Sequence, residues 1–232
     1  RYRQMSDYQP SARRPIANIF RRTADSTVRL CVRLGIHPDI VSYASIGAAA
    51  GAGICFWQAM HWPWLLLIGS VLCFVRLWFN MLDGMVALAA GKASFKGEII
   101  NELPDRISDV LIFVGVAYSG LAHPASGYLA AILALMTAYV GMLGQAVGAQ
   151  RQFGGLMAKP WRMVVLSIGA VVTMVLLLRA DGGAGYPAVP AGGQLSVLDW
   201  ACVVVVIGCV QTIVVRLAAM VRNLRNQAGG ES

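Results

Sequence analysis

The sequence predicts an all-α integral membrane protein with six transmembrane helices and an N-terminal interfacial amphipathic helix. Of its 232 residues, 57% are hydrophobic and 13% are charged, whereas soluble domains carry about 25% charged residues. The mean hydropathy is +0.63. The length allows about six apolar stretches of roughly 20 residues, which is what a helix needs to cross a bilayer. We therefore expect one helical membrane domain.

The chain begins with a basic, polar arm. Residues 16–35 mix apolar residues with Arg21, Arg22, Arg29 and Arg33, a pattern typical of a helix that lies in the membrane interface. A solvated basic arm is the alternative. No cleavable signal peptide is expected, because this region lacks an apolar stretch. We expect a cytoplasmic arm and interfacial helix at 1–35, the membrane domain at 36–226 and a C-terminal tail at 227–232.

Apolar periodicity places the six spans at 39–60, 62–90, 95–119, 126–148, 161–179 and 197–219. Pro38 suits the first turn of the first span, where a backbone N–H is not needed. That span is rich in Gly and Ala, which let membrane helices approach closely. Trp62 and Trp64 mark a membrane interface before the second span.

Basic residues indicate the orientation. Nearly all Lys and Arg lie in the N-terminal arm, the loops after the second and fourth spans, and the C-terminal tail, whereas the opposite loops offer only Arg179. By the positive-inside rule, both termini are cytoplasmic and the protein is a multi-pass protein of the cell (inner) membrane. The net charge of +8 then indicates contact with anionic lipid and not with nucleic acid.

One stretch, from Asn80 to Asp109, is unusually acidic for a membrane segment and holds five of the eleven acidic residues. A carboxylate at the centre of a membrane helix costs about 2.5–3.5 kcal/mol, so these groups should face a cavity, a cation or each other. The acidic and carboxamide residues of this stretch are Asn80, Asp83, Glu98, Asn101, Glu102, Asp105 and Asp109.

Helical spacing gathers these groups into two stripes. Arg76, Asn80 and Asp83 share one face of the second span, and the residues from Glu98 to Asp109 share one face of the third. Two antiparallel helices can turn such stripes toward each other, and their oxygens suit Mg²⁺ or Mn²⁺. Gly84 leaves space beside Asp83, and Pro104 interrupts the helical hydrogen bonds beside Asp105.

Two other interpretations remain open for the acidic stretch. Arg76 and Arg106 could neutralise the acids in a buried salt-bridge network, although two arginines face five carboxylates. A proton or ion pathway is the other alternative.

The motif resembles the signature of the CDP-alcohol phosphatidyltransferases, Asp-x2-Asp-Gly-x2-Ala-Arg-x8-Gly-x3-Asp-x3-Asp. The chain keeps every spacing and matches five of the eight specified positions, from Asp83 to Asp105. It departs at Asn80, Leu88 and Asn101, where the family has Asp, Arg and Asp. HPDIVS at 37–42 is similar to the stretch that opens the first helix of the family. The resemblance extends over about 16–222.

The resemblance implies transfer of a phosphatidyl group from CDP-diacylglycerol, or a similar CDP-alcohol, to a hydroxyl acceptor with release of CMP. It implies that Asp105 is the general base and that Mg²⁺ or Mn²⁺ lies among Asn80, Asp83, Asn101 and Asp105. It also implies a homodimer, since the family is commonly dimeric. The implied nucleotide contacts are Pro38, Asp39, Ser42, Gly84, Leu88 and Ser94, with Lys92 beside them.

The two Asp-to-Asn departures remove negative charge from the implied ligand set. Glu102 and Asp109 lie on the same stripe and could restore it, and Asp109 repeats the Asp-x3-Asp spacing, so it could be the base. The alternative is a catalytically degenerate relative that binds lipid or partners.

Basic residues after the fourth span suggest the acceptor. Arg151, Lys159 and Arg162 face the same side as the acidic stretch and could hold a phosphorylated acceptor. Ordinary positive-inside loop charge explains them equally well.

Overall fold

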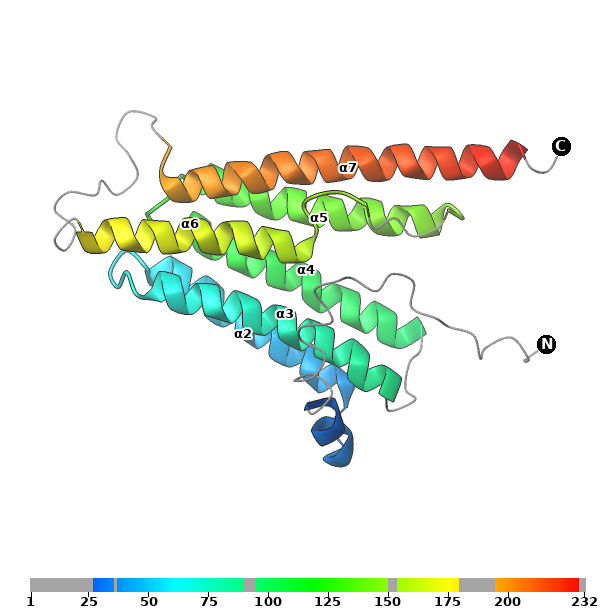
Figure 1. The fold of residues 1–232 in the computed structure, drawn as a ribbon, viewed down its shortest axis with the longest axis horizontal. Coiled ribbons are helices and arrows are strands. Elements are labelled where there is room, and N and C mark those ends of the chain that lie inside the picture. The colour runs from blue at the N-terminus through cyan, green and yellow to red at the C-terminus, as the bar shows by residue number, and fades with distance from the viewer. Residues whose placement is uncertain (1–26, 36, 90–94, 150–153, 180–194, 230–232) are drawn as a thin grey trace.

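The computed structural model describes residues 27–35, 37–89, 95–149, 154–179 and 195–229. These residues are helical or lie in turns and loops, and they contain no strand, so the predicted all-α class is confirmed. The long helices, drawn in Figure 1, are α2 (Pro38–Gln58), α3 (Leu65–Ala89), α4 (Phe95–Ala117), α5 (Pro124–Ala146), α6 (Lys159–Arg179) and α7 (Val197–Gly229).

Five of these helices are long and apolar enough to cross a membrane: α2, α3, α5, α6 and α7. The expected third span, α4, is helical where predicted but does not meet this measure, because charged residues crowd its first half. The multi-pass character is therefore established, whereas the count of six spans stays a prediction. Helix α7 continues to Gly229, ten residues beyond the predicted end of the last span at 219.

The start of α2 follows the sequence prediction. Pro38 is its first residue, and the side chain of His37 accepts a hydrogen bond from the Asp39 backbone N–H at 3.5 Å. Proline is suited to this position because its missing N–H would have no helical partner.

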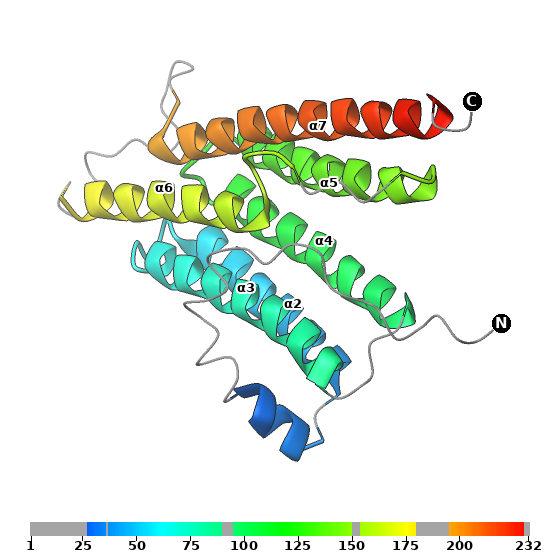
Figure 2. The same ribbon diagram turned by 45° about the vertical axis from the view of Figure 1, so that its right-hand side comes forward.

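The six long helices form a closed ring. Each packs against two neighbours in the order α2, α3, α6, α7, α5, α4 and back to α2. Helices that follow one another in the sequence run in opposite directions (Figure 2). Helices α3 and α4, which carry the two predicted polar stripes, touch each other only slightly, because α2 packs against both of them. Polar groups from α3 and α4 therefore meet across the inside of the ring.

Glycines bring α2 and α4 into close contact. A Cβ atom added at Gly115 would clash with the backbone of Gly53, and one added at Gly53 would clash with the Leu111 carbonyl. The expectation that small residues of the first span allow a close helix approach is confirmed.

Apolar side chains fill most of the ring, with large members such as Phe56, Phe113 and Met163 fully buried. Many others point outward, including Ile132, Ile168 and Ile207, as expected for helices that face lipid. The five cysteines are free: Cys31, Cys73, Cys202 and Cys209 are buried and Cys55 is half-buried.

Before α2, residues 27–33 are helical. Val28 and Cys31 pack against Val41, Leu82 and Val86, which lie on α2 and α3. The rest of the predicted amphipathic helix lies outside the described residues, so its position in the membrane interface stays a prediction.

Candidate active site

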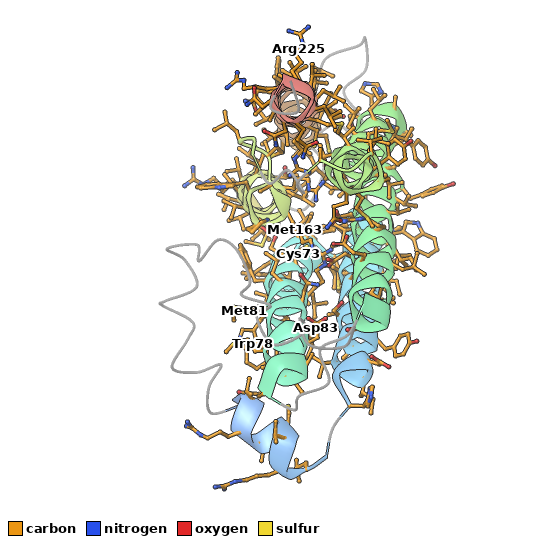
Figure 3. The ribbon with its side chains drawn as sticks, turned by 90° about the vertical axis from the view of Figure 1, so that its right-hand side faces the viewer. Cys73, Trp78, Met81, Asp83, Met163 and Arg225 are labelled. Atoms are coloured by element: carbon orange, nitrogen blue, oxygen red, sulfur yellow. The ribbon has the colours of Figure 1, made fainter. Side chains whose placement is uncertain are left out.

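Asp83, near the end of α3, points into the helix ring (Figure 3). It is 1% exposed. Its carboxylate accepts hydrogen bonds from the Ser42 hydroxyl of α2 at 2.8 Å and from the Gly84 backbone N–H at 2.6 Å. Within the described residues, no ion pair to Asp83 is formed. Its two hydrogen bonds are therefore its direct contacts, and Lys159 acts on its charge from beyond ion-pair distance.

The space beside Asp83 is open at Gly84. A Cβ atom added there would meet no atom within 4 Å. The absence of a side chain is therefore not needed for packing, and it leaves room for a ligand next to the carboxylate.

Arg76, two turns before Asp83, reaches across the ring to α4. Its Nη2 atom lies 2.9 Å from the Asp105 carbonyl oxygen, 3.3 Å from Asp105 Oδ1 and 3.1 Å from Asp109 Oδ1. All three side chains are buried. The two predicted stripes thus face each other, and Arg76 joins them.

A second cation reaches the site from α6. Lys159, the first residue of that helix, places its Nζ atom 3.0 Å from the Asn80 carboxamide oxygen and forms an ion pair with Asp105 Oδ2. Asp105 is therefore held between Arg76 and Lys159.

Arg162, one turn further along α6, is also buried. Its Nη2 atom lies 2.9 Å from Asp109 Oδ2, and its Nη1 atom donates to the Ala134 carbonyl and the Thr137 hydroxyl of α5 at 3.0 and 2.9 Å. Asp109 thus lies between Arg76 and Arg162, although neither of its oxygens has a well-aligned hydrogen-bond donor in the described structure.

These contacts change the charge balance that the sequence suggested. Asp105 and Asp109 each have two cationic partners, and the additional cations come from α6. Arg106, expected to neutralise the central acids, forms its ion pair with Glu102, four residues earlier on α4. The salt-bridge interpretation is therefore correct for Arg76, which pairs with Asp105 and Asp109. Arg106 instead pairs with Glu102.

For several predicted site residues, the structure does not describe the side chain. Lys92, Ser94 and Arg151 lie outside the described residues, and the side chains of Pro38, Leu88 and Asn101 are likewise not described. Asp39, a predicted nucleotide contact, is half-buried and pairs with His37 at 3.2 Å.

The described residues include no group of three His, Cys, Asp or Glu side chains that could hold a metal ion. The donors at hand are oxygens: Asp83, with open space beside it, and the Asn80 and Asp105 oxygens, which already share one cation, Lys159. Oxygen donors are the chemistry that Mg²⁺ and Mn²⁺ prefer. The donor set therefore fits a cation, with Lys159 in part of the space.

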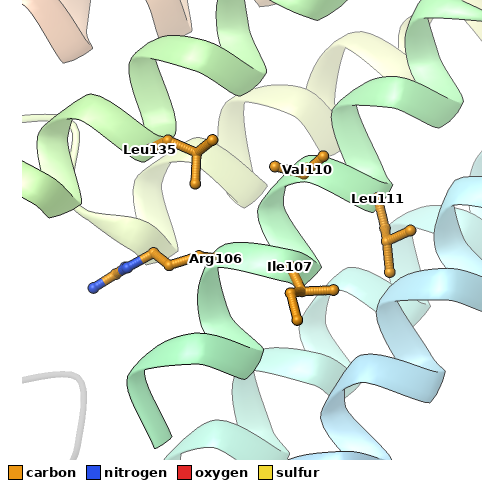
Figure 4. Close-up of a pocket in the computed structure, with 5 residues that line it drawn as sticks. All are labelled: Arg106, Ile107, Val110, Leu111 and Leu135. Carbon is orange, nitrogen blue, oxygen red and sulfur yellow. The ribbon is translucent and has the colours of Figure 1, made fainter. Parts of the chain in front are cut away.

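Two hollows on the described surface are lined mainly by apolar residues and contain none of these carboxylates. One of ≈ 230 Å³ lies between α4 and α5 and is lined by Arg106, Ile107, Val110, Leu111 and Leu135 (Figure 4). A second, of ≈ 400 Å³, lies between α2 and α4. Both lie along outward helix faces, where lipid chains would contact the protein.

Sequence reasoning missed two features of this region. It read Lys159 and Arg162 as loop charge or acceptor ligands and did not foresee their ion pairs, because these pairs join residues 54 and 53 positions apart. It also overlooked Asp199, a fully buried acid at the start of α7. The available signal was the spacing Ser196-x-x-Asp199 before an apolar run, which is typical of a capping box at a helix start.

No protein-family model matches the chain. Among curated proteins, it is 27% identical over 187 residues to the phosphatidylinositol phosphate synthase of Mycobacterium tuberculosis, which covers 78% of this chain and 79% of the relative. The corresponding enzyme of Cutibacterium acnes is 32% identical over 131 residues, 55% of this chain and 59% of the relative. Inner membrane protein YnbA of Escherichia coli is 25% identical over 135 residues, 58% of this chain and 67% of the relative.

Solved structures show the same fold. The M. tuberculosis phosphatidylinositol phosphate synthase with CDP-DAG bound superposes with a TM-score of 0.65 at 22% identity, covering 86% of this chain and 94% of that one. The same enzyme in complex with manganese and citrate gives a TM-score of 0.66, covering 85% and 88%. The relatives thus support the resemblance to the CDP-alcohol phosphatidyltransferases, and the structures show that this chain has the fold of one of those synthases.

Proposed function

We propose that this protein transfers a phosphatidyl group from CDP-diacylglycerol, or from a similar CDP-alcohol, to a hydroxyl acceptor in phospholipid synthesis and releases CMP. The observation that carries this proposal is the similarity over 187 residues to enzymes named phosphatidylinositol phosphate synthase. The motif residues Asp83 and Asp105, both buried inside the ring, support it.

In the reaction, a bond forms between the acceptor oxygen and the β-phosphorus, and the bond from that phosphorus to the CMP oxygen breaks. Asp105 takes the proton of the acceptor hydroxyl, as general bases do when they lie within hydrogen-bond reach. Catalysis otherwise depends on positioning and on neutralising phosphate charge.

A divalent metal ion belongs to this proposal. Asn80, Asp83, Asn101 and Asp105 would hold it, with Glu102 and Asp109 as additional acids on α4. When bound, the ion polarises the diphosphate and stabilises the leaving CMP. A structural neighbour crystallised with manganese and the open space beside Asp83 support this assignment.

The nucleotide would lie beside Asp83, against the start of α2 and the end of α3. Ser42 and Gly84 both contact the Asp83 carboxylate, so they fix its orientation and flank the open space. The remaining proposed nucleotide contacts are Pro38, Asp39, Leu88, Lys92 and Ser94.

The proposed acceptor ligands are Arg151, Lys159 and Arg162, which would hold a phosphorylated alcohol. We call the end of the ring where α6 begins its mouth. The Lys159 side chain is 21% exposed, so its ammonium can reach a ligand at the mouth of the ring. Arg162 is 3% exposed and bound to Asp109, Ala134 and Thr137. In addition to supplying positive charge for the acceptor, Arg162 would hold the start of α6 in place.

A second candidate is a catalytically degenerate relative that binds CDP-alcohol lipids without turning them over. The pairing of Asp105 with both Arg76 and Lys159 favours it, because both carboxylate oxygens already have a cationic partner and an acceptor hydroxyl would have to replace one of them.

The decisive experiment measures CMP release from CDP-diacylglycerol by purified protein with Mg²⁺ or Mn²⁺, against a panel of phosphorylated and unphosphorylated alcohols. Release with one acceptor, lost in Asp105→Asn, supports the transferase. Binding of CDP-diacylglycerol by folded protein without CMP release from any acceptor supports the degenerate relative.

A further inference from the structure

Lys159 lies where three helices meet at the mouth of the ring. Its ammonium contacts the Asn80 oxygen of α3 and the Asp105 carboxylate of α4 from the first turn of α6. Asn80 and Asp105 are also the first and last positions of the motif. A cation therefore already lies between two of the oxygens that the proposed function assigns to a metal ion.

We propose that Lys159 is a tethered counter-cation of this site, which neutralises Asp105 until a divalent metal ion displaces it. The inference rests on the divalent metal of the proposed function. It adds that Lys159 and the metal ion compete for the Asp105 carboxylate. It predicts that removing the lysine charge strengthens metal binding.

The occupancy of Asp105 is the first argument. Oδ1 lies 3.3 Å from the Arg76 guanidinium, and Oδ2 is paired with Lys159. A metal ion that binds Asp105 must therefore replace at least one of these partners, because like charges held a few ångströms apart repel strongly inside a protein.

The difference between the two partners is the second argument. Arg76 is fully buried and also bound to the Asp105 carbonyl and to Asp109. Lys159 is 21% exposed and carries its charge on a flexible four-carbon stem. Its head group can move to the mouth of the ring, whereas that of Arg76 cannot, so Lys159 is the displaceable cation.

Asn80 supplies the third argument. A carboxamide contributes an acceptor oxygen without negative charge, so the Asn80 and Asp105 pair carries a single negative charge. With Lys159 and Arg76 both beside Asp105, that charge is already balanced. A dication entering the same position would gain only one counter-charge there, which makes the tethered monovalent cation an effective competitor.

The first test measures Mn²⁺ binding to the purified full chain without nucleotide, by electron paramagnetic resonance of free Mn²⁺. Lys159→Met is expected to bind Mn²⁺ at least tenfold more tightly than the parent protein, and Lys159→Arg should remain within about threefold of it. Arg179→Met is the matched control, because Arg179 is an exposed cation in the last turn of the same helix. Equal or weaker binding by Lys159→Met, or no Mn²⁺ binding by any variant, overturns the proposal.

A second test needs no variant, so it holds even if Lys159→Met fails to fold. An amine-acylating reagent is applied to the unmodified protein with and without Mn²⁺, and labelling is followed peptide by peptide. Mn²⁺ should raise the labelling rate of Lys159 several-fold, while that of a free amine added to the same solution as an internal standard stays constant. An unchanged or slower rate at Lys159 overturns the proposal. Both tests are independent of CMP release, so a failed transferase assay would leave them interpretable.

Discussion

Arg76 on α3 is joined to Asp105 on α4 at both the main chain and the side chain. The guanidinium Nη2 lies 2.9 Å from the Asp105 carbonyl oxygen and 3.3 Å from Oδ1 of its carboxylate. These two helices hardly touch otherwise. One arginine therefore spans the inside of the ring and fixes the position of the proposed base.

Replacing Arg76 with Met should destabilise the protein strongly. The change leaves the buried Asp105 and Asp109 with one cation each, and breaking a buried ion pair on one side typically costs about 3–5 kcal/mol. Thermal unfolding in detergent measures the effect.

Arg106→Met is the matched control for Arg76→Met. Its ion pair with Glu102 is partly exposed, with 20% and 17% of the two side chains accessible, and such pairs contribute about 0–1 kcal/mol. Equal losses of stability in the two variants would contradict the central role of Arg76.

Asp109→Asn should reduce stability, whereas Asp105→Asn should reduce catalysis. Asp109 is fully buried between Arg76 and Arg162, so removing its charge leaves two buried guanidinium groups less well paired. Asp105→Asn removes the proposed base, and loss of a general base costs about 10²–10⁴-fold in rate.

The two aspartate variants are compared by the melting temperature and by kcat for CMP release from the folded fraction. A larger kcat loss in Asp109→Asn than in Asp105→Asn, with both folded, would instead favour Asp109 as the base.

The positions of the helices could be predicted from the sequence, because apolar periodicity and Pro38 are local signals. The predicted stripes of α3 and α4 also face each other, as the reach of Arg76 shows. The ring order could not be predicted, because it depends on non-local packing such as the contact of Gly53 with Gly115.

The ion pairs of α6 could not be predicted for a related reason. Lys159 and Arg162 follow a loop rich in basic residues, where positive charge is expected on orientation grounds alone. Only the closure of the ring brings the start of α6 beside Asp105 and Asp109. The charge balance of the site thus depends on a helix far away in the sequence.

Gly115→Ala should loosen the contact between α2 and α4. The new Cβ would clash with the Gly53 backbone, and overpacking of this kind costs about 1–3 kcal/mol. Gly47→Ala is the control, because a Cβ there would meet no atom within 4 Å. Thermal unfolding should show a loss for Gly115→Ala alone, and equal behaviour of the two variants would mean that α2 and α4 do not pack this closely.

Asp199 links α5 and α7 at the end of the ring opposite to the proposed site. Its Oδ1 atom accepts hydrogen bonds from the His123 backbone N–H at 2.8 Å and the Ser126 hydroxyl at 2.6 Å, and its Oδ2 atom accepts from the Ser196 backbone N–H at 2.9 Å. The carboxylate therefore ties the start of α7 to the start of α5, far along the helices from Asp105.

Asp199→Ala should consequently lower stability without altering the proposed site. Each buried donor left without a partner costs about 1–3 kcal/mol, so the melting temperature should fall clearly, and Asp199→Asn, which keeps one acceptor oxygen, should fall less. Mn²⁺ affinity of the folded fraction should match that of the parent protein, because the Asn80, Asp105 and Lys159 contacts are untouched. A changed Mn²⁺ affinity with an unchanged melting temperature would contradict this division, since it would couple Asp199 to the metal site and not to the packing of α5 and α7.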